Sequence, residues 1–263
     1  MPSLFLPEYE RWLWAIGVGS IRTIPIVWLI PAFGGQNVPQ QVRMGLGLAL
    51  SALVLPQVLL SLPTGGSTLF WMILLAREAA VGLAVGFVAA CVFRAAEVAG
   101  RLVDTLRGAN MAEVLSPVTE GRSSPLGDIY LLLTVVIFLE LGGIGRISLA
   151  LARSYDAVPL DLERTGAGMA SVATLVILTT GKLLESAIAL CAPAIVALFL
   201  ADLILGAIAR MAPQIPVYFV GMPLKALAGV GIVFVTLGGL ETALYGIFEG
   251  WAVLVDRAFE IWR

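Results

Sequence analysis

Long apolar runs dominate the chain and are separated by short polar segments. Six runs reach the length of about 20 residues that an α-helix needs to cross a bilayer. They cover Arg11–Pro31, Val42–Leu62, Leu69–Phe93, Leu126–Ala152, Met169–Ala209 and Val217–Phe259. The last two are too long for one simple span. The pattern therefore predicts an all-α, polytopic helical membrane protein.

Most of these runs carry charged residues near the middle, and several contain proline. The charged residues are Arg22, Arg77, Glu78, Glu140, Arg146, Lys182, Glu185, Asp202, Lys225 and Glu241. A charge at the centre of a membrane helix costs roughly 2.5–3.5 kcal/mol on insertion scales, so such charges face protein or a watery cavity. We therefore expect broken helices that are buried in an assembly, although any single charged side chain could instead snorkel to the interface.

Small residues recur at helical spacing within the runs. Gly82 and Gly86 form a GxxxG pair that Ala90 continues, and further glycines cluster around Gly142 and Gly238. Small side chains let helix backbones approach closely in a membrane, where hydrophobicity cannot drive helices together. The stripes predict a tightly packed bundle.

The most polar stretch, residues 94–128, lies between the third and fourth runs. Its first half carries charges three or four residues apart, at Arg94, Glu97, Arg101, Asp104 and Arg107. The pairs Glu97–Arg101 and Asp104–Arg107 can form along one helix face, which predicts an amphipathic helix continuing the third run. Glycine and proline then break the helix into a loop, whose length favours a functional role over a plain connection.

Composition agrees with a bilayer as the solvent, because 59% of the residues are hydrophobic and only 13% are charged. The net charge of -2 gives no reason to expect nucleic acid as a partner. Glu8, Glu10 and Arg11 precede the first apolar run, unlike the basic start of a signal peptide, so we expect insertion through the membrane segments themselves.

The sequence offers little chemistry for catalysis. The absence of histidine removes Ser-His triads and histidine metal sites. Cys91 and Cys191 lie far apart and have no CxxC partner, so we expect buried, inert thiols. No P-loop, Rossmann pattern or zinc signature is present. We predict a protein that is not an enzyme and that has no catalytic residues, no metal site and no cofactor.

Three blocks of the sequence resemble one family. Glu97 to Gly108 places an acid, a glycine, an aspartate and a glycine along a helix that enters a loop with Ser116-Pro117 and Ser123–Gly127. A second block holds Arg22, Pro25, Pro31, Phe33-Gly34, Pro39 and Arg43. The most specific block holds Ala192-Pro193, Asp202, Gly206, Arg210–Gln214 and Gly221–Lys225. Over nearly its whole length the chain resembles the T-type subunit of the type III secretion export apparatus (R-type in flagella; the FliR/SctT family). The loop strings favour the virulence injectisome branch over the flagellar one.

The resemblance implies a structural, pore-forming subunit of the export gate, in the bacterial inner membrane within the basal body of the secretion system. The implied partners are P-type (SctR/FliP-like) and Q-type (SctS/FliQ-like) subunits, the U-type (FlhB-like) switch subunit, the lipid membrane, and unfolded secreted proteins that pass through the pore. It also implies a P-type-like helical part over residues 1–165, with a polar loop over 108–127. A Q-type-like helical hairpin follows over 166–263, with its tip near 211–216.

Two groups of residues are expected to serve this role. Loop residues Asn110, Met111, Val114, Leu115, Ser116 and Pro117 are expected to plug the resting channel. Apolar side chains at a constriction exclude water, and methionine adapts to what passes; the resemblance places this loop in the channel entrance. Polar residues Glu97, Asp104, Asp202, Arg210, Gln214 and Lys225 are expected to make assembly contacts. Asp202 and Lys225 flank the hairpin tip from opposite arms and can pair with each other or with a neighbouring subunit.

A secondary transporter is the alternative function. In that case Arg77, Glu78, Lys182 and Glu185 would line a substrate path through the membrane. A transporter should show matched hydrophobic halves. The segments Arg22–Pro25 and Arg210–Pro213 share a pattern, but their surroundings do not match. Stable co-purification with other subunits would separate the two functions.

Overall fold

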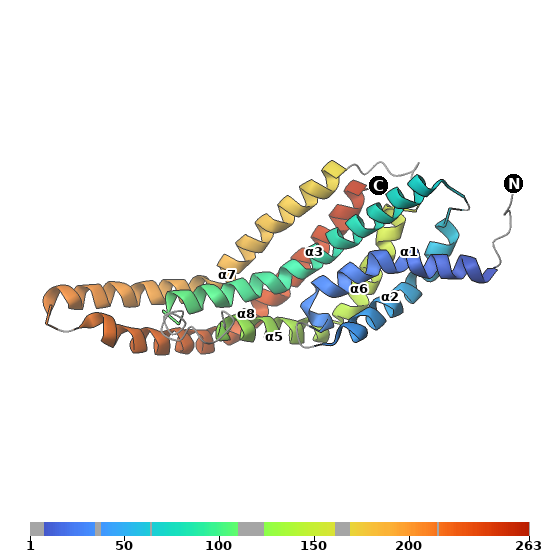
Figure 1. The fold of residues 1–263 in the computed structure, drawn as a ribbon. Helices are drawn as coiled ribbons and strands as arrows, with labels where there is room; N and C mark the ends of the chain where they lie inside the picture. Colours follow the sequence, from blue (N-terminus) through green and yellow to red (C-terminus); the bar gives the residue numbers. More distant parts are fainter. Residues whose placement is uncertain are drawn as a thin grey trace. The chain divides into compact units, whose positions relative to one another are not determined.

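The computed structural model describes residues 8–34, 38–63, 65–109, 124–160, 169–214 and 216–262. Every regular element within these ranges is helical, and none is a strand. The helices are α1 (Glu8–Leu29), the 3₁₀ turn η1 (Pro31–Phe33), α2 (Gln40–Ser61), α3 (Thr68–Leu106), α5 (Pro125–Glu140), α6 (Gly143–Ala157), α7 (Met169–Met211) and α8 (Val217–Trp262) (Figure 1). The predicted all-α class is confirmed.

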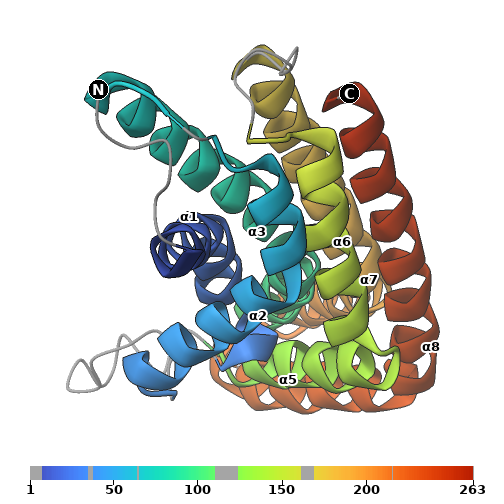
Figure 2. The same cartoon turned by 90° about the vertical axis from the view of Figure 1, so that its right-hand side faces the viewer.

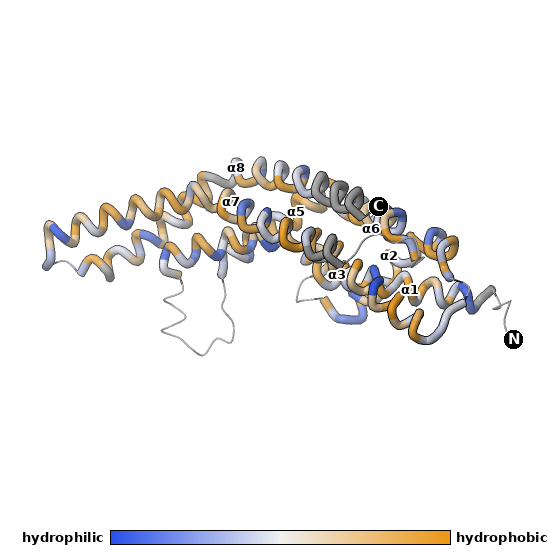
Figure 3. Tube along the Cα trace, turned by 90° about the horizontal axis from the view of Figure 1, so that it is seen from above, coloured by the Kyte–Doolittle hydropathy of each residue, from blue (hydrophilic) through white to orange (hydrophobic). Residues whose placement is uncertain are grey.

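Several of these helices have the length and composition of membrane spans. Four qualify singly, namely α1, α2, α3 and α7, and the number rises to six if two bent helix pairs each count as one span. The bent pairs are α5 with α6 and the two halves of α8. Apolar residues recur along all of these helices (Figure 3). The chain is therefore a polytopic helical membrane protein, as predicted.

The fourth predicted run differs from the structure, because it is two helices rather than one. Between α5 and α6, Gly142 adopts φ +67°, a left-handed conformation that glycine reaches without steric strain. Its N–H donates a hydrogen bond to the Leu139 carbonyl, which closes the last turn of α5. Gly143 lies so close to the Phe138 ring that any larger side chain would overlap it. The glycines seen in the sequence thus end one helix and allow the next to begin.

The contacts divide the chain into two units. Unit 1 comprises Met1–Cys91, Phe138–Gly181 and Glu249–Arg263, and unit 2 comprises Val92–Ile137 and Lys182–Phe248. Helices α3, α7 and α8 each contribute residues to both. This division follows spatial contacts, whereas the predicted parts 1–165 and 166–263 are successive stretches of the chain. The predicted division therefore stays a proposal.

In unit 1, α1 and α2 form an antiparallel pair, and α2 also contacts α6 (Figure 2). The Ser51 hydroxyl donates to the Ile16 carbonyl at 3.3 Å, and the Thr23 hydroxyl donates to the Gly47 carbonyl at 2.9 Å. The later residue of α1 contacts the earlier residue of α2, so the two helices run antiparallel. Each hydroxyl donates a hydrogen bond to a backbone carbonyl of the other helix, the kind of contact by which polar side chains join helices within a membrane.

The predicted glycine stripe of α3 packs directly on the backbone of α1. A Cβ at Gly82 would overlap the Arg22 carbonyl oxygen, and one at Gly86 would lie 3.0 Å from Ile26 Cα. Ala90 continues the stripe and is buried. Close approach therefore explains why small residues recur at this spacing, as the GxxxG pattern predicts.

Gly82→Ala is expected to destabilise the chain by about 1–3 kcal/mol, because the added methyl group must push α1 and α3 apart. Gly17→Ala is the matched control, since a Cβ on Gly17 meets nothing within 4 Å. Alanine in a helix interior is favoured over glycine by roughly 0.5–1 kcal/mol, so the control should raise the melting temperature in detergent. Equal shifts for the two variants would contradict the close contact.

Candidate functional site

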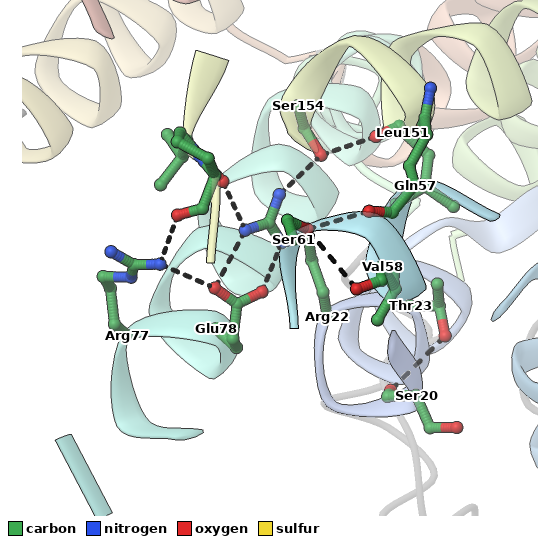
Figure 4. A network of polar contacts seen from close by, with 12 residues as sticks. Ser20, Arg22, Thr23, Gln57, Val58, Ser61, Arg77, Glu78, Leu151 and Ser154 are labelled. Carbon is green, nitrogen blue, oxygen red and sulfur yellow. Dashed lines mark hydrogen bonds and ion pairs between the residues drawn. The ribbon is translucent and has the colours of Figure 1, made fainter. Parts of the chain in front are cut away.

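A buried ion pair joins α1 to α3 at the centre of unit 1. Arg22 and Glu78 are both fully buried. The Arg22 Nε lies 2.7 Å from Glu78 Oε2, and Arg22 Nη2 lies 2.9 Å from Glu78 Oε1 (Figure 4). This is the bidentate fork that arginine and carboxylate form, and it is both stronger and more directional than a single contact.

The rest of the Arg22 guanidinium binds the end of α6. Nη1 donates to the Ser154 hydroxyl at 3.1 Å, and Nη2 donates to the Val158 carbonyl at 2.9 Å. The guanidinium also lies over the Tyr155 ring, 3.8 Å from its centroid, in a cation–π contact. Each guanidinium nitrogen therefore has a partner within this chain.

A second arginine reaches the same end of α6. Arg77 Nη2 donates to the Pro159 carbonyl at 2.6 Å and lies 3.3 Å from Glu78 Oε1. The last carbonyls of a helix lack partners within the helix and carry partial negative charge, so cations stabilise them. Arg22 and Arg77 thus hold the segment that follows α6, with the Glu78 carboxylate between them.

These contacts change the interpretation of the charges predicted for the membrane runs. Arg22 and Glu78 neutralise each other, so another subunit is not needed to compensate them. In unit 2, Lys182 and Glu185 of α7 pair at 2.8 Å, with both side chains more than half exposed. Arg77, Glu78, Lys182 and Glu185 were expected to line a transporter path. Each of them instead forms an ion pair with another residue of this chain.

In unit 2 the buried carboxylate of Asp104 connects the end of α3 to the start of α5. Its Oδ2 accepts hydrogen bonds from the Ser124 hydroxyl at 2.6 Å and from the Leu126 N–H at 3.0 Å. Its Oδ1 accepts from Arg107 Nε at 2.7 Å. An acidic side chain at a helix N-terminus satisfies a free N–H and interacts favourably with the helix dipole. Asp104 therefore caps a helix that begins at Pro125, far from it in the sequence.

The glycines of the same motif make this junction possible. A Cβ on Gly100 would lie 2.5 Å from the Leu126 carbonyl oxygen, and one on Gly127 would lie 3.2 Å from the Glu97 carbonyl oxygen. Side chains larger than hydrogen would therefore separate α3 from α5. The resemblance singled out Gly100 without giving this reason.

The predicted ion pairs along α3 are present. Glu97, whose side chain is largely buried, accepts from Arg101 at 2.5 Å and from Arg94 at 2.7 Å. Asp104 and Arg107 form the second predicted pair. Arg107 also packs against α8, where a Cβ on Gly229 would lie 3.1 Å from Arg107 Cδ.

The predicted hairpin tip falls between α7 and α8. Lys225 Nζ lies 2.6 Å from Asp202 Oδ1, so the two arms are joined by an ion pair within this chain. The Asp202 side chain is 51% exposed and that of Lys225 is 19% exposed. Arg210 and Gln214 are exposed near the tip. The role of these residues in assembly stays a prediction.

The predicted plug residues, Asn110 to Pro117, lie outside the described residues. The described chain stops at Ala109 and resumes at Ser124. The Ala109 N–H donates to the Asp104 carbonyl at 3.0 Å, and Ser124 binds the Asp104 side chain. Asp104 therefore fixes the two points between which the loop runs.

In the described part of the chain, no group of three or more His, Cys, Asp or Glu side chains could hold a metal ion. Cys91 and Cys191 are buried and not disulfide-bonded, as predicted.

Comparison with known proteins agrees with the predicted family. Residues 13–250 match the family described as bacterial export proteins, family 1. The secretion system apparatus protein SsaT of Salmonella typhimurium is 31% identical over 84% of this chain and 85% of its own length. The flagellar biosynthetic protein FliR of Bacillus subtilis is 27% identical over 87% and 88%. The Yop proteins translocation protein T of Yersinia pestis is 35% identical over 59% of each chain.

These relatives include both injectisome and flagellar proteins, and their names describe components of export machinery rather than enzymes. The match includes residues of both units and of every described helix from α1 to α8. The family match over residues 13–250 extends over nearly the whole chain, as the resemblance does. The chain therefore belongs to family 1 of the bacterial export proteins.

Proposed function

We propose that this chain is a structural, pore-forming subunit of the type III secretion export gate in the bacterial inner membrane, and that unfolded proteins pass through the gate. The observation that carries the proposal is the family match over residues 13–250, with relatives named for secretion and flagellar export. The charges of unit 1 support it, because they stabilise helix junctions and need no substrate to pair with. The higher identity to an injectisome relative favours the virulence branch.

The partners in this proposal are the P-type and Q-type subunits and the U-type switch subunit. Residues 1–165 would supply a P-type-like part, and residues 166–263 a Q-type-like hairpin formed by α7 and α8. Large apolar side chains are exposed on this hairpin, among them Phe199, Leu203, Ile204, Phe219 and Leu227. An exposed apolar surface of this kind is typical of a contact with protein or lipid.

A transporter function is less well supported. A substrate path needs polar side chains that are free to bind a solute. Arg22 uses all three guanidinium nitrogens within the chain, and Glu78 uses both carboxylate oxygens on Arg22. Binding a solute there would first require breaking a buried ion pair.

Secretion in a strain that lacks its own T-type subunit tests the proposed function. Expression of this chain together with its P-type and Q-type partners should restore the appearance of substrate proteins in the culture medium. The matched control expresses the partners alone. If secretion is no higher with the chain than without it, although the chain accumulates in the membrane, the proposed function is wrong.

The ion pair of the hairpin leads to a prediction about assembly. Asp202→Ala and Lys225→Ala should each reduce the yield of the complex with P-type and Q-type partners. The swapped variant, Asp202→Lys with Lys225→Asp, should recover part of that yield because it restores the attraction between the arms. The yield is measured by affinity purification through this chain. Wild-type assembly and secretion in both single variants would show that the pair has no role in assembly.

The loop beyond α3 leads to a prediction about the resting channel. Deleting residues 110–115 should leave assembly intact, because the contacts that join α3 to α5 are made by residues 97–104 and 124–127, outside the deleted segment. We expect resting cells with this variant to leak ions and small solutes, because apolar residues at the constriction would be lost. Ion leakage is measured with a membrane-potential dye. A complex that remains as tight to small ions as the wild type would exclude this segment as the plug.

A further inference from the structure

The α1–α2 hairpin of unit 1 has aromatic and arginine side chains at both ends. At one end, Trp12 and Trp14 are 49% and 48% exposed at the start of α1. The Trp14 ring lies 5.2 Å from the ring of Trp71, which stands near the start of α3. Arg11 reaches across to the Leu59 carbonyl near the end of α2 at 2.9 Å. Tryptophan and arginine are the side chains that proteins place at a membrane–water interface.

The opposite end carries the same combination. Trp28, near the end of α1, is 51% exposed. The Arg43 guanidinium, in the first turn of α2, lies 5.9 Å from the centroid of the Trp28 ring. Each end of the hairpin therefore carries tryptophan and arginine, and at the Trp28 end the two side chains form a cation–π contact.

The distance between the two ends is close to the thickness of the hydrocarbon core of a bilayer. At 1.5 Å per residue, Trp12 and Trp28 are about 24 Å apart along α1, as are Arg43 and Leu59 along α2. The hydrocarbon core of a bilayer is roughly 30 Å thick, and long side chains reach outward by several ångströms to the headgroups. The hairpin can therefore span the core with its tryptophan rings at both boundaries.

The surface between the two ends is apolar. In the sequence, the only charged residue between Arg11 and Arg43 is Arg22, and α2 has no charge beyond Arg43. Arg22 is fully buried and paired with Glu78. The exposed large side chains along the middle of α2 are all aliphatic, namely Leu46, Leu48 and Leu53. Acyl chains could cover this face without any charge being moved out of water.

We propose that the outer face of the α1–α2 hairpin is bound by lipid acyl chains, with Trp12, Trp14 and Trp71 at one headgroup region and Trp28 and Arg43 at the other. A contact with another subunit would also cover apolar side chains, but it gives no reason for tryptophan and arginine at both ends with the spacing of a bilayer. The proposal needs only that the chain is a membrane protein, and it does not depend on the export role.

Spin-label accessibility in lipid nanodiscs tests the proposal on the intact chain within its co-purified complex. Cysteine replaces Val42, Leu53 or Leu60 in turn, three exposed positions along α2. Leu50→Cys is the control on the same helix, because Leu50 is 7% exposed and its label should report a packed interior. The unsubstituted complex, treated in the same way, provides the background from native thiols such as Cys91 and Cys191, which are buried.

We expect oxygen collisions to be most frequent at position 53 and to decrease toward positions 42 and 60. Collisions with a water-soluble nickel complex should follow the opposite order, because the nickel complex stays outside the hydrocarbon core. Low accessibility to both reagents at position 53 would mean that a protein subunit covers this face. High accessibility of position 53 to nickel would mean that water covers it. Either result overturns the proposal, and neither bears on whether the complex supports secretion.

Discussion

Glu78→Ala is expected to destabilise the chain by roughly 3–5 kcal/mol, because it leaves the Arg22 guanidinium buried without its carboxylate. Arg22 would keep its bonds to Ser154 and Val158, but neither of these groups carries a charge that could balance the guanidinium. A loss of this size is a large fraction of the roughly 5–15 kcal/mol by which folded domains are stable. We therefore expect the variant to fail to accumulate in the membrane, or to aggregate on detergent extraction in fluorescence-detected size-exclusion chromatography.

Two further variants show whether the loss of stability comes from breaking the ion pair or from removing any glutamate. Glu185→Ala removes an acid from α7 whose side chain is 68% exposed and that pairs with Lys182, and it should change stability little. The double variant Arg22→Met with Glu78→Leu removes both charges and should recover much of the loss, since apolar pairs often replace buried ion pairs without penalty. If Glu78→Ala lowers stability no more than Glu185→Ala does, the conclusion that Arg22 and Glu78 form a buried ion pair is wrong.

Asp104→Asn is expected to have the next largest effect, a destabilisation of about 2–3 kcal/mol. The carboxylate accepts bonds from Ser124, Leu126 and Arg107, whereas an asparagine side chain has a single acceptor oxygen and no charge. The variant would leave Arg107 or the start of α5 without its partner. Thermal unfolding in detergent measures the change.

Asp128→Asn is the matched control for Asp104→Asn. Asp128 lies in the first turn of α5 and is exposed, so the same substitution there removes only a weak interaction with the helix dipole. We expect its melting temperature to stay close to that of the wild type. Similar melting temperatures for the two variants would show that Asp104 does not hold α3 to α5.

The helices could be predicted from the sequence because their signals are local. Runs of apolar residues of membrane length coincide with the described α-helices, although α5 and α6 fall within one run. The i,i+3 and i,i+4 spacing of Glu97, Arg101, Asp104 and Arg107 predicted ion pairs that the structure contains. The break at Gly142 was missed, because a glycine within an apolar run is equally compatible with a continuous helix.

The buried contacts between distant residues could not be predicted in this way. Arg22 and Glu78 are 56 residues apart, and nothing in the sequence indicated that these two charges pair with each other. Their pairing depends on how α1 packs against α3, which hydrophobic periodicity does not determine. Asp104 was expected to make an assembly contact, and nothing in its spacing from Ser124 indicates that it caps α5. A single sequence shows which of these groups are charged or can form hydrogen bonds, but not which of them lie close together in the fold.

Affinity purification through this chain, after co-expression with P-type and Q-type partners, tests most directly whether it is an assembled subunit of the export gate. We expect one stable heteromeric complex in detergent, and cryo-electron microscopy of that complex should place α7 and α8 against neighbouring subunits. A monodisperse and thermally stable monomer that leaves both partners in the flow-through would contradict the proposed role.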